Sequence, residues 1–346
     1  MRRPNRLQFA TKEGIGPNLP AVGGATPRSK EAIIWRKLRS NFGDGLFHMA
    51  VFGCALAVIA ILSLIILQLY LNSRLSLHAF GWKFLTTSVW DPVNSEFGAL
   101  PIIYGTLVSS AVALVLAVPL GLGVAVFITE MCPQWLTGAL SFTTELLAAI
   151  PSVIYGLWAI FVLVPILRLQ VEPWLARHFQ WTGLFSGPAY GIGMLAGGVI
   201  LAIMIVPIIS SITREVLAAV PRNQREAVLA LGATRWEMIR TGVLRNARAG
   251  ILGAIILGLG RALGETMAVT MVIGNRAEIA KSLFAPGYTM ASVIANEFSE
   301  ASGDLYLNAL VEVALVLFVV TIIVNALARL LVWTVTHGVG ARVHAQ

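Results

Sequence analysis

The chain of 346 residues is 57% hydrophobic and 12% charged, and its mean hydropathy is +0.80. An ordinary soluble domain carries about 25% charged residues, so the composition excludes a typical soluble protein and indicates a bilayer as solvent. The net charge of +8 is concentrated in residues 1–45, with nine basic and three acidic residues, and 213–248, with seven and three. This clustering is typical of the cytoplasmic segments of a membrane protein and argues against nucleic-acid binding.

Six apolar runs are each long enough to cross the hydrocarbon core, which takes about 20 residues in a helix. Lipid offers no hydrogen-bond partner to exposed backbone, so runs of this length must be helical. The alternating pattern of an outer-membrane barrel is absent. The sequence therefore predicts an all-α polytopic membrane protein with a transmembrane domain over residues 46–335. The six predicted spans are 46–71, 102–129, 138–167, 191–212, 249–274 and 306–333.

The orientation of these spans follows from the charges at their ends. The basic segment 1–45 is predicted to be a disordered cytoplasmic tail. Counting six crossings then places the loop 213–248 and the short tail 336–346 in the cytoplasm as well. Segment 78–100 faces the other side, and its aromatic residues predict that it lies along the membrane interface. Both termini of this multi-pass protein are expected in the cytoplasm.

Two ionisable residues of the fifth predicted span are candidates for function. Arg261 lies near the middle of that span, where an uncompensated charge costs about 2.5–3.5 kcal/mol. Glu265 follows one helical turn later on the same face and can compensate it. The pair either sets the packing of a polar bundle interior or holds an arginine that handles an anion, since a guanidinium suits a tetrahedral oxyanion. Composition alone leaves both interpretations open.

Two further glutamates fall within predicted spans. Glu145 precedes Pro151, which favours a kink, and we expect it to pack as a polar group against a neighbouring helix, with a role in a transport pathway as the alternative. Glu312 lies near the end of the last span and is expected to reach water. Glycines spaced four apart predict close helix packing at two sites, Gly193 with Gly197 and Gly260 with Gly264.

The loop 213–248 carries a short amphipathic helix. Pro221 is predicted to begin this helix and Gly232 to end it. A second amphipathic stretch, residues 234–239, leads back to the membrane. A helix of this kind either docks into a groove of another protein or lies on anionic lipid. The sequence contains no Walker A motif, so ATP binding through a P-loop is not expected.

Several motifs of this chain resemble those of one family. Glu226-Ala227 followed by Gly232 resembles the EAA loop of the permease subunits of ABC importers, a loop that docks onto a separate ATPase. Longer stretches resemble the phosphate-specific permeases of that family, the PstC type, and the similarity runs over residues 46–335. These stretches are Trp90-Asp-Pro-Val93, Phe97-Gly-Ala-Leu-Pro-Ile-Ile-Tyr-Gly105, Glu145-Leu-Leu-Ala-Ala-Ile-Pro-Ser-Val-Ile-Tyr-Gly156 and Arg261-Ala-Leu-Gly-Glu265-Thr-Met-Ala-Val-Thr-Met-Val-Ile-Gly-Asn275.

The resemblance implies a MetI-like bundle of six helices in the inner membrane of a bacterium, which translocates inorganic phosphate and is not itself an enzyme. The implied partners are a second phosphate permease subunit forming a heterodimer, a homodimeric ATP-binding subunit and an extracytoplasmic phosphate-binding protein. No cofactor or metal is expected on this chain, because the ATPase would hold ATP and Mg²⁺.

The resemblance also assigns roles to particular residues. It implies that Arg261 and Glu265 are needed for the passage of phosphate, and Glu145 is a further candidate for the substrate pathway. The residues expected to couple the chain to the ATPase are Arg222, Arg225, Glu226, Ala227, Gly232 and Ala233.

Two other functions remain open at this level. The same architecture could import another oxyanion or nutrient, and loss of Arg261 would then spare phosphate uptake. A secondary transporter or channel working alone would need no ATPase. Its inverted repeats should appear as matched halves of the hydropathy pattern, and the sequence shows no convincing match.

Overall fold

The computed structural model describes the backbone of residues 27–343 and the side chains of residues 44–334. The chain divides into two units after Ile65, and helix α1 (Pro27–Asn72) crosses that boundary. Residues 1–26 of the predicted disordered tail lie outside the described part, whereas residues 27–45 form the beginning of α1. The predicted C-terminal tail is helical up to Val343, where α15 (Asp304–Val343) ends.

Within the described residues, six helices are long and apolar enough to cross a membrane, and this confirms the predicted number. The third and the fifth differ from their predicted bounds in ways that matter for the candidate site. The six spans are Asp44–Asn72, Leu100–Met131, Ser152–Thr182, Met194–Ala218, Arg235–Gly264 and Asp304–Thr334.

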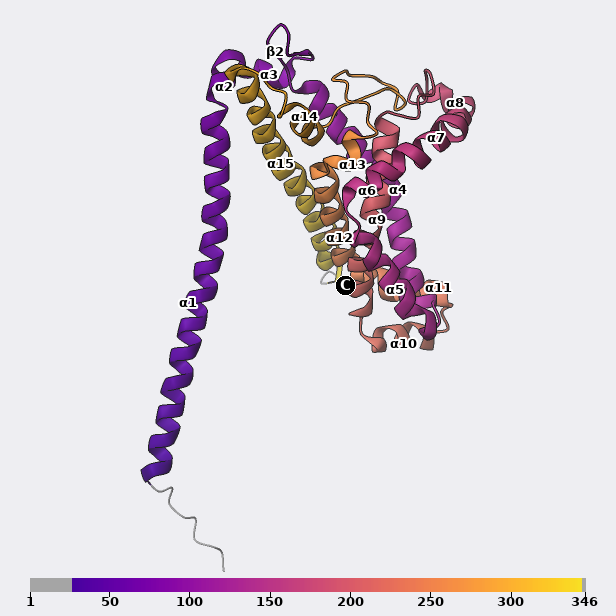
Figure 1. Cartoon of the computed structure of the whole chain (residues 1–346). Coiled ribbons are helices and arrows are strands. Elements are labelled where there is room, and N and C mark those ends of the chain that lie inside the picture. Colours follow the sequence, from indigo (N-terminus) through magenta and orange to yellow (C-terminus); the bar gives the residue numbers. More distant parts are fainter. Residues whose placement is uncertain (1–26, 344–346) are drawn as a thin grey trace, which may run out of the picture. The chain divides into compact units, whose positions relative to one another are not determined.

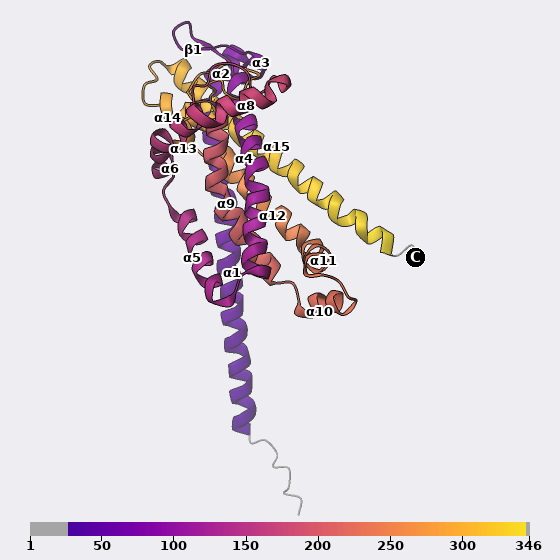
Figure 2. The same cartoon turned by 90° about the vertical axis from the view of Figure 1, so that its right-hand side faces the viewer.

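The centre of the second unit consists of α4 (Leu100–Val126), α9 (Met194–Ala218) and α12 (Arg245–Gly264), which run side by side (Figures 1 and 2). Glycines let these helices approach closely. A Cβ atom added at Gly198 would lie 2.5 Å from Cγ1 of Val112 on α4. Apolar side chains gain little by leaving lipid for one another, so tight packing of this kind is what stabilises the bundle.

The third predicted span, 138–167, is wrong, because two helices meet inside it. Helix α5 (Gln134–Ala149) ends before Ile150 and Pro151, whose backbone is extended with ψ angles of 130° and 138°. The residue before a proline is disfavoured in the α conformation, so the helix ends here instead of kinking. The chain continues as α6 (Ser152–Trp158), π-helical Ala159–Leu163, α7 (Val164–Ile166), π-helical Leu167–Val171, α8 (Glu172–Phe179) and a 3-10 turn, Gln180–Thr182.

The fifth span begins well before its predicted start at residue 249. Its first turn is α11 (Arg235–Glu237), where Thr234 and Glu237 each accept a hydrogen bond from the other's backbone N–H in a capping box. This arrangement satisfies N–H groups that a helix start leaves without partners. A π-helical segment, Met238–Leu244 (η5), then leads into α12.

The fifth span also ends earlier than predicted. Helix α12 ends at Gly264, because Glu265 is extended with a ψ angle of 129°, and the short helix α13 (Met267–Thr270) follows. Arg261 therefore lies in the last turn of α12 and not in the middle of a span, which corrects the sequence-based placement. A cation is also electrostatically favoured at that end of a helix.

The end of the second unit drawn uppermost in Figure 1 carries short elements. Among the aromatic residues that predict a segment along the membrane interface, Phe84 and Phe97 are buried in a core cluster, whereas Trp82 is exposed. The short elements are α2 (Arg74–Phe80), α3 (Lys83–Thr86), the antiparallel strands β1 (Trp90–Asp91) and β2 (Glu96–Phe97), and α14 (Met290–Glu297).

Aromatic contacts hold this hairpin against the bundle. The ring of Phe97 stacks on Tyr306 of α15 at 5.2 Å between centroids and meets Trp90 edge-on at 5.0 Å. Glu297 of α14 accepts hydrogen bonds from Nε1 of Trp90 at 2.8 Å and from the hydroxyl of Tyr306 at 2.6 Å. These contacts join the hairpin, α14 and α15 into one body, as expected of buried aromatic rings with a polar group to pair.

Substitution of Gly105, near the start of α4, tests how closely the bundle is packed. A Cβ atom there would lie 2.1 Å from the carbonyl oxygen of Tyr288, so Gly105→Ala must push backbone apart. We expect it to lower the free energy of unfolding by about 1–3 kcal/mol. The measurement is the apparent Tm of the purified protein in detergent.

The matched control is Gly138→Ala on α5, where no described atom lies within 4 Å of the added Cβ. Because alanine is the better helix former, this variant should be as stable as the unmodified protein or more so. Equal Tm values for the two variants would contradict the packing described for α4.

Candidate functional site

Arg261 and Glu265 form an ion pair at the end of α12. Nη2 of Arg261 lies 3.2 Å from Oε2 of Glu265. The side chain of Glu265 is only 4% exposed, whereas that of Arg261 is 50% exposed. The chain thus buries the carboxylate and leaves half of the guanidinium open, although both residues sit in an otherwise apolar region.

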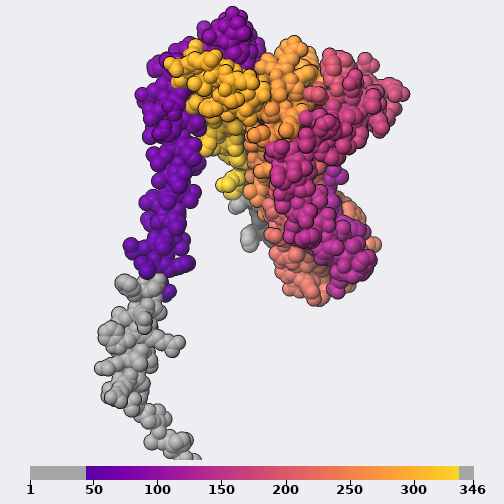
Figure 3. Space-filling view, viewed as in Figure 1, coloured from indigo at the N-terminus to yellow at the C-terminus, as the bar shows by residue number. Residues whose placement is uncertain are grey.

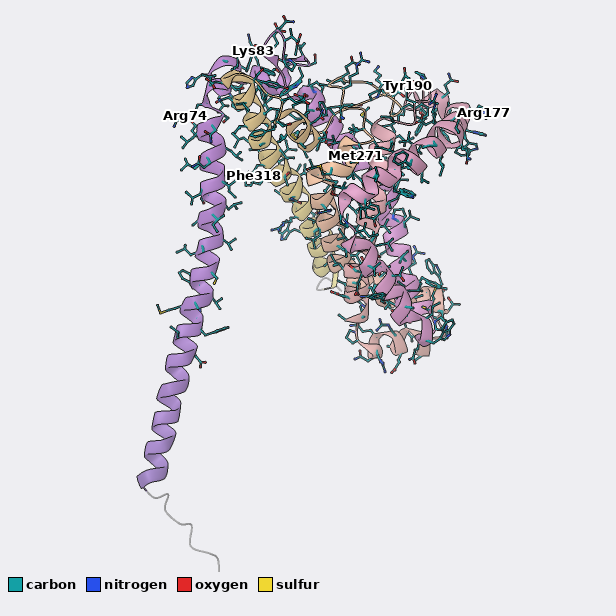
Figure 4. All side chains as sticks on the ribbon, in the orientation of Figure 1. Arg74, Lys83, Arg177, Tyr190, Met271 and Phe318 are labelled. Atoms are coloured by element: carbon teal, nitrogen blue, oxygen red, sulfur yellow. The ribbon has the colours of Figure 1, made fainter. Side chains whose placement is uncertain are left out.

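The break after Gly264 fixes the position of this carboxylate. Glu265 is the first residue beyond the helix, and its Oε1 lies 3.5 Å from the backbone N–H of Ala268 in α13. Met271, which follows α13 and is labelled in Figure 4, packs against α6: a Cβ atom added at Gly156 would lie 2.5 Å from its sulfur. The carboxylate of Glu265 is therefore held by the backbone of α13, and it in turn pairs with the guanidinium of Arg261.

The face of α12 around Arg261 is open. Leu257 and Met267 are exposed, and no described atom lies within 4 Å of a Cβ atom added at Gly260 or Gly264. The prediction of close helix packing at these two glycines therefore finds no packing partner among the described residues of this chain. Two neighbouring glycines with this spacing leave a shallow surface beside the guanidinium.

The other predicted glycine pair packs inside the chain. A Cβ atom added at Gly193 would lie 2.4 Å from the carbonyl oxygen of Phe284, and one at Gly197 would lie 3.4 Å from side-chain carbons of Ile273. The two glycine pairs thus have different surroundings, although their sequence patterns are the same.

Glu145 pairs with a residue that the sequence did not single out. Its Oε1 accepts a hydrogen bond at 2.8 Å from Nη2 of Arg214 on α9. The carboxylate is exposed and the arginine is half-buried. The geometry matches polar packing against a neighbouring helix, which was the first interpretation of Glu145.

Glu312 does not reach water, contrary to the prediction. It is 3% exposed, because α2 packs against α15 at this level. Among the described residues, Oε2 of Glu312 has no hydrogen-bond partner. The carboxylate of Glu172, at the start of α8, is also buried and accepts a hydrogen bond at 2.9 Å from the N–H of Gly191.

The short helix predicted in the loop is α10 (Arg222–Ala230), which begins after Pro221 as expected. Gly232 has a φ of +85°, a conformation that side chains disfavour, and it turns the chain two residues after α10 ends. The helix lies at the end of the bundle opposite the hairpin, and it contributes to the lower surface in Figure 3.

The predicted coupling residues differ in exposure. Arg222, Glu226, Ala227 and Gly232 are exposed, whereas Arg225 and Ala233 are half-buried. Leu231 and Trp236 expose large apolar surfaces beside them. A cavity of about 620 Å³ opens here, and its lining includes Arg222, Glu226, Leu229, Arg235 and Trp236. An exposed mixture of apolar and charged groups around a hollow suits contact with another protein.

The side chain of Arg225 donates hydrogen bonds to groups outside α10. Its Nη2 donates to Oε1 of Glu130 at 2.8 Å and to the carbonyl of Leu217 at 2.8 Å, and its Nε donates to the same Glu130 oxygen at 3.3 Å. Its Nη1 donates to the carbonyl of Val220. Sequence reasoning missed Glu130, since nothing in a separation of 95 residues signals this pair.

Comparison with known proteins identifies the family. Residues 117–336 match the model of the binding-protein-dependent transport system inner membrane component. The chain is 47% identical over 327 residues to the phosphate transport system permease protein PstC of Mesorhizobium japonicum, which covers 93% of this chain and 100% of that protein. The protein of the same name from Haemophilus influenzae is 44% identical over 293 residues, covering 84% and 93% respectively.

The fold is also similar to that of a solved chain of the MetNI methionine ABC transporter. The TM-score is 0.51 at 20% sequence identity, covering 68% of this chain and 94% of the other. This likeness concerns the fold alone and agrees with a bundle of six membrane-spanning helices. The chain belongs to the family of binding-protein-dependent transport system inner membrane components.

Proposed function

We propose that this chain is the permease subunit of an ATP-driven importer that carries inorganic phosphate across the inner membrane of a bacterium. The observation that carries the proposal is a half-exposed guanidinium, Arg261, paired with a buried carboxylate on an open helix face. The relatives named as phosphate permeases, at 47% and 44% identity, support the choice of substrate. The chain itself is a non-catalytic subunit of an ABC transporter.

The proposed role of Arg261 follows from its charge and its neighbour. A guanidinium is always charged and presents N–H donors in a fork that matches a tetrahedral oxyanion. Glu265 takes up part of this donor set at 3.2 Å and leaves the rest free. Its negative charge also lowers the attraction for the anion, so that phosphate is favoured in transit without being trapped. A pathway role for Glu145 remains a weaker proposal, because its carboxylate is paired with Arg214.

A second phosphate permease subunit would complete the pathway as a heterodimer. The open face of α12 carries Gly260 and Gly264, and small residues of this kind let helices of two subunits approach closely in lipid. Because Arg261 extends from this same face, phosphate would pass along the boundary between the two subunits.

At the loop end, α10 would dock onto a homodimeric ATPase that holds ATP and Mg²⁺. This proposal rests on the exposed residues Arg222, Glu226 and Ala227, and on the cavity beside them. The positive-inside rule orients α10 and both termini toward the cytoplasm. The hairpin of β1 and β2 then faces outward, where an extracytoplasmic phosphate-binding protein would deliver its ligand.

Replacement of Arg261 tests the substrate site. In proteoliposomes holding this chain with its partner permease and ATPase, and with binding protein outside, Arg261→Gln should lower ATP-dependent uptake of labelled phosphate by about a hundredfold. This estimate corresponds to the loss of charge-assisted hydrogen bonds to the anion. Arg261→Lys should keep part of the uptake, since it retains the charge but not the fork.

The control is Arg177→Gln. Arg177 is an exposed residue near the end of α8 and is labelled in Figure 4. This variant should import phosphate at the unmodified rate. Full phosphate uptake by an assembled Arg261→Gln complex would overturn Arg261 as the substrate site.

Replacement of Glu226 tests docking of α10. Glu226→Ala removes an exposed charge from the proposed contact, and Gly232→Ala places a side chain at a φ of +85°. Each should reduce co-purification of the ATPase by about tenfold, as loss of one well-placed contact does. Glu215→Ala, at an exposed glutamate of α9, should leave co-purification unchanged. Wild-type recovery of ATPase with both loop variants would rule out α10 as the docking element.

A further inference from the structure

Arg225 joins α10 to two other helices of the bundle. Its guanidinium lies between Glu130, at the end of the span that begins with α4, and two carbonyls: that of Leu217, in the last turn of α9, and that of Val220, two residues beyond the end of α9. The carbonyls at the end of a helix have no partners within it and carry partial negative charge. One arginine therefore pairs with a carboxylate and caps a helix at the same time.

The burial of this pair distinguishes it from a surface ion pair. The side chain of Glu130 is 6% exposed and that of Arg225 is 17% exposed. Exposed pairs contribute little to stability, but removal of one partner from a buried pair leaves the other charge without compensation. Glu130 therefore depends on Arg225, and α10 cannot leave this position without exposing the carboxylate or leaving it unpaired.

A second set of contacts joins α10 to the span that carries Arg261. Nδ2 of Asn246 donates to Oε1 of Gln224 on α10 at 2.8 Å and to the carbonyl of Gly242 at 2.7 Å. A Cβ atom added at Gly242 would lie 3.2 Å from Cγ2 of Val228, so η5 also packs directly on α10. Asn246 is in the first turn of α12 and Arg261 in its last, roughly 22 Å away along one continuous helix.

We propose that Arg225 and Glu130 form a transmission joint: a positioning pair that makes α10 move as one body with α4, α9 and α12. The inference rests on the proposed function, in which a partner ATPase moves α10. Displacement of α10 would then displace α12 and the guanidinium of Arg261, which is the rigid-body form of coupling between sites. Glu130, which lines the cavity beside α10 together with Arg225, thereby acquires a role in transport through its ion pair.

This role differs from the docking role that the sequence suggested for Arg225. A residue that contacts the ATPase must present its donors to solvent in the isolated chain. The guanidinium of Arg225 instead directs its three nitrogens at Glu130, Leu217 and Val220. Arg222, one turn earlier, is exposed and is the better docking residue.

A double-mutant cycle on the whole complex tests the joint. The variants are Glu130→Gln, Arg225→Gln and the double variant, each assembled with partner permease, ATPase and binding protein in proteoliposomes. The readouts are co-purification of the ATPase, ATP hydrolysis, and phosphate imported per ATP hydrolysed. A residue that only stabilises the fold would lower yield and total activity and leave this last ratio unchanged.

We expect all three variants to retain the ATPase and to hydrolyse ATP. The phosphate imported per ATP should fall about tenfold in Glu130→Gln and further in Arg225→Gln, which also loses the cap on α9. The double variant should match Arg225→Gln alone, because interacting residues are not additive. Glu278→Gln, which removes a 2.8 Å ion pair with Arg276 elsewhere in the chain, should keep the unmodified ratio.

Three results would overturn the joint: an unmodified ratio in Glu130→Gln, loss of ATPase co-purification in Arg225→Gln, or independent effects that multiply in the double variant. If Glu130→Gln does not assemble, Glu130→Asp carries the test, since a shorter acid keeps the charge and should give an intermediate ratio. Failure of the unmodified complex to import phosphate at the expense of ATP would instead refute the proposed function itself.

Discussion

The end of α12 at Gly264 determines where the charges of this membrane protein lie. If the helix continued to residue 274, Arg261 would sit at mid-span and Glu265 would share its exposure. The extended backbone of Glu265 instead turns its carboxylate into the packed region around α13, where it is 4% exposed. Arg261 remains paired with Glu265, and half of its side-chain surface remains exposed. The proposed phosphate pathway depends on this asymmetry between the two members of one ion pair.

A charge in an apolar bundle must be paired, and this constraint also applies at the end of the bundle where α10 lies. Glu130 is buried and meets Arg225, which also caps α9. The two ion pairs are connected by α12, whose first turn contacts α10 and whose last turn carries Arg261. We propose that one pair handles the substrate and that the other holds the helix that receives motion from the ATPase. Neither pair needs a flexible segment, since rigid helices connect them.

The sequence predicted the parts of this structure that depend on composition and on local signals. The number of spans follows from hydropathy, and the bounds of α10 follow from Pro221 and Gly232. The break at Pro151 was predicted only as a kink, because hydropathy does not register a change of two ψ angles between apolar residues. The end of α12 was missed for the same reason, since apolar residues continue on both sides of Glu265.

Contacts between distant segments were beyond reach from one sequence. The burial of Glu312 depends on α2 folding back against α15, and the pairing of Glu145 depends on the register of α5 beside α9. The partner of Arg225 could not be predicted from the sequence alone, because Glu130 lies 95 residues away from it in the chain. Sequence motifs thus indicated where the sites lie, whereas the contacts of each residue followed only from the packing of the helices.

The proposed function requires the assembled complex to use ATP to import phosphate. The most direct test is the accumulation of labelled phosphate in proteoliposomes of the unmodified complex, with binding protein outside and ATP inside. We predict accumulation of phosphate against a gradient that requires ATP and is abolished by omission of the ATPase. Accumulation of phosphate without ATPase would contradict it, as would an assembled complex that hydrolyses ATP and accumulates no phosphate.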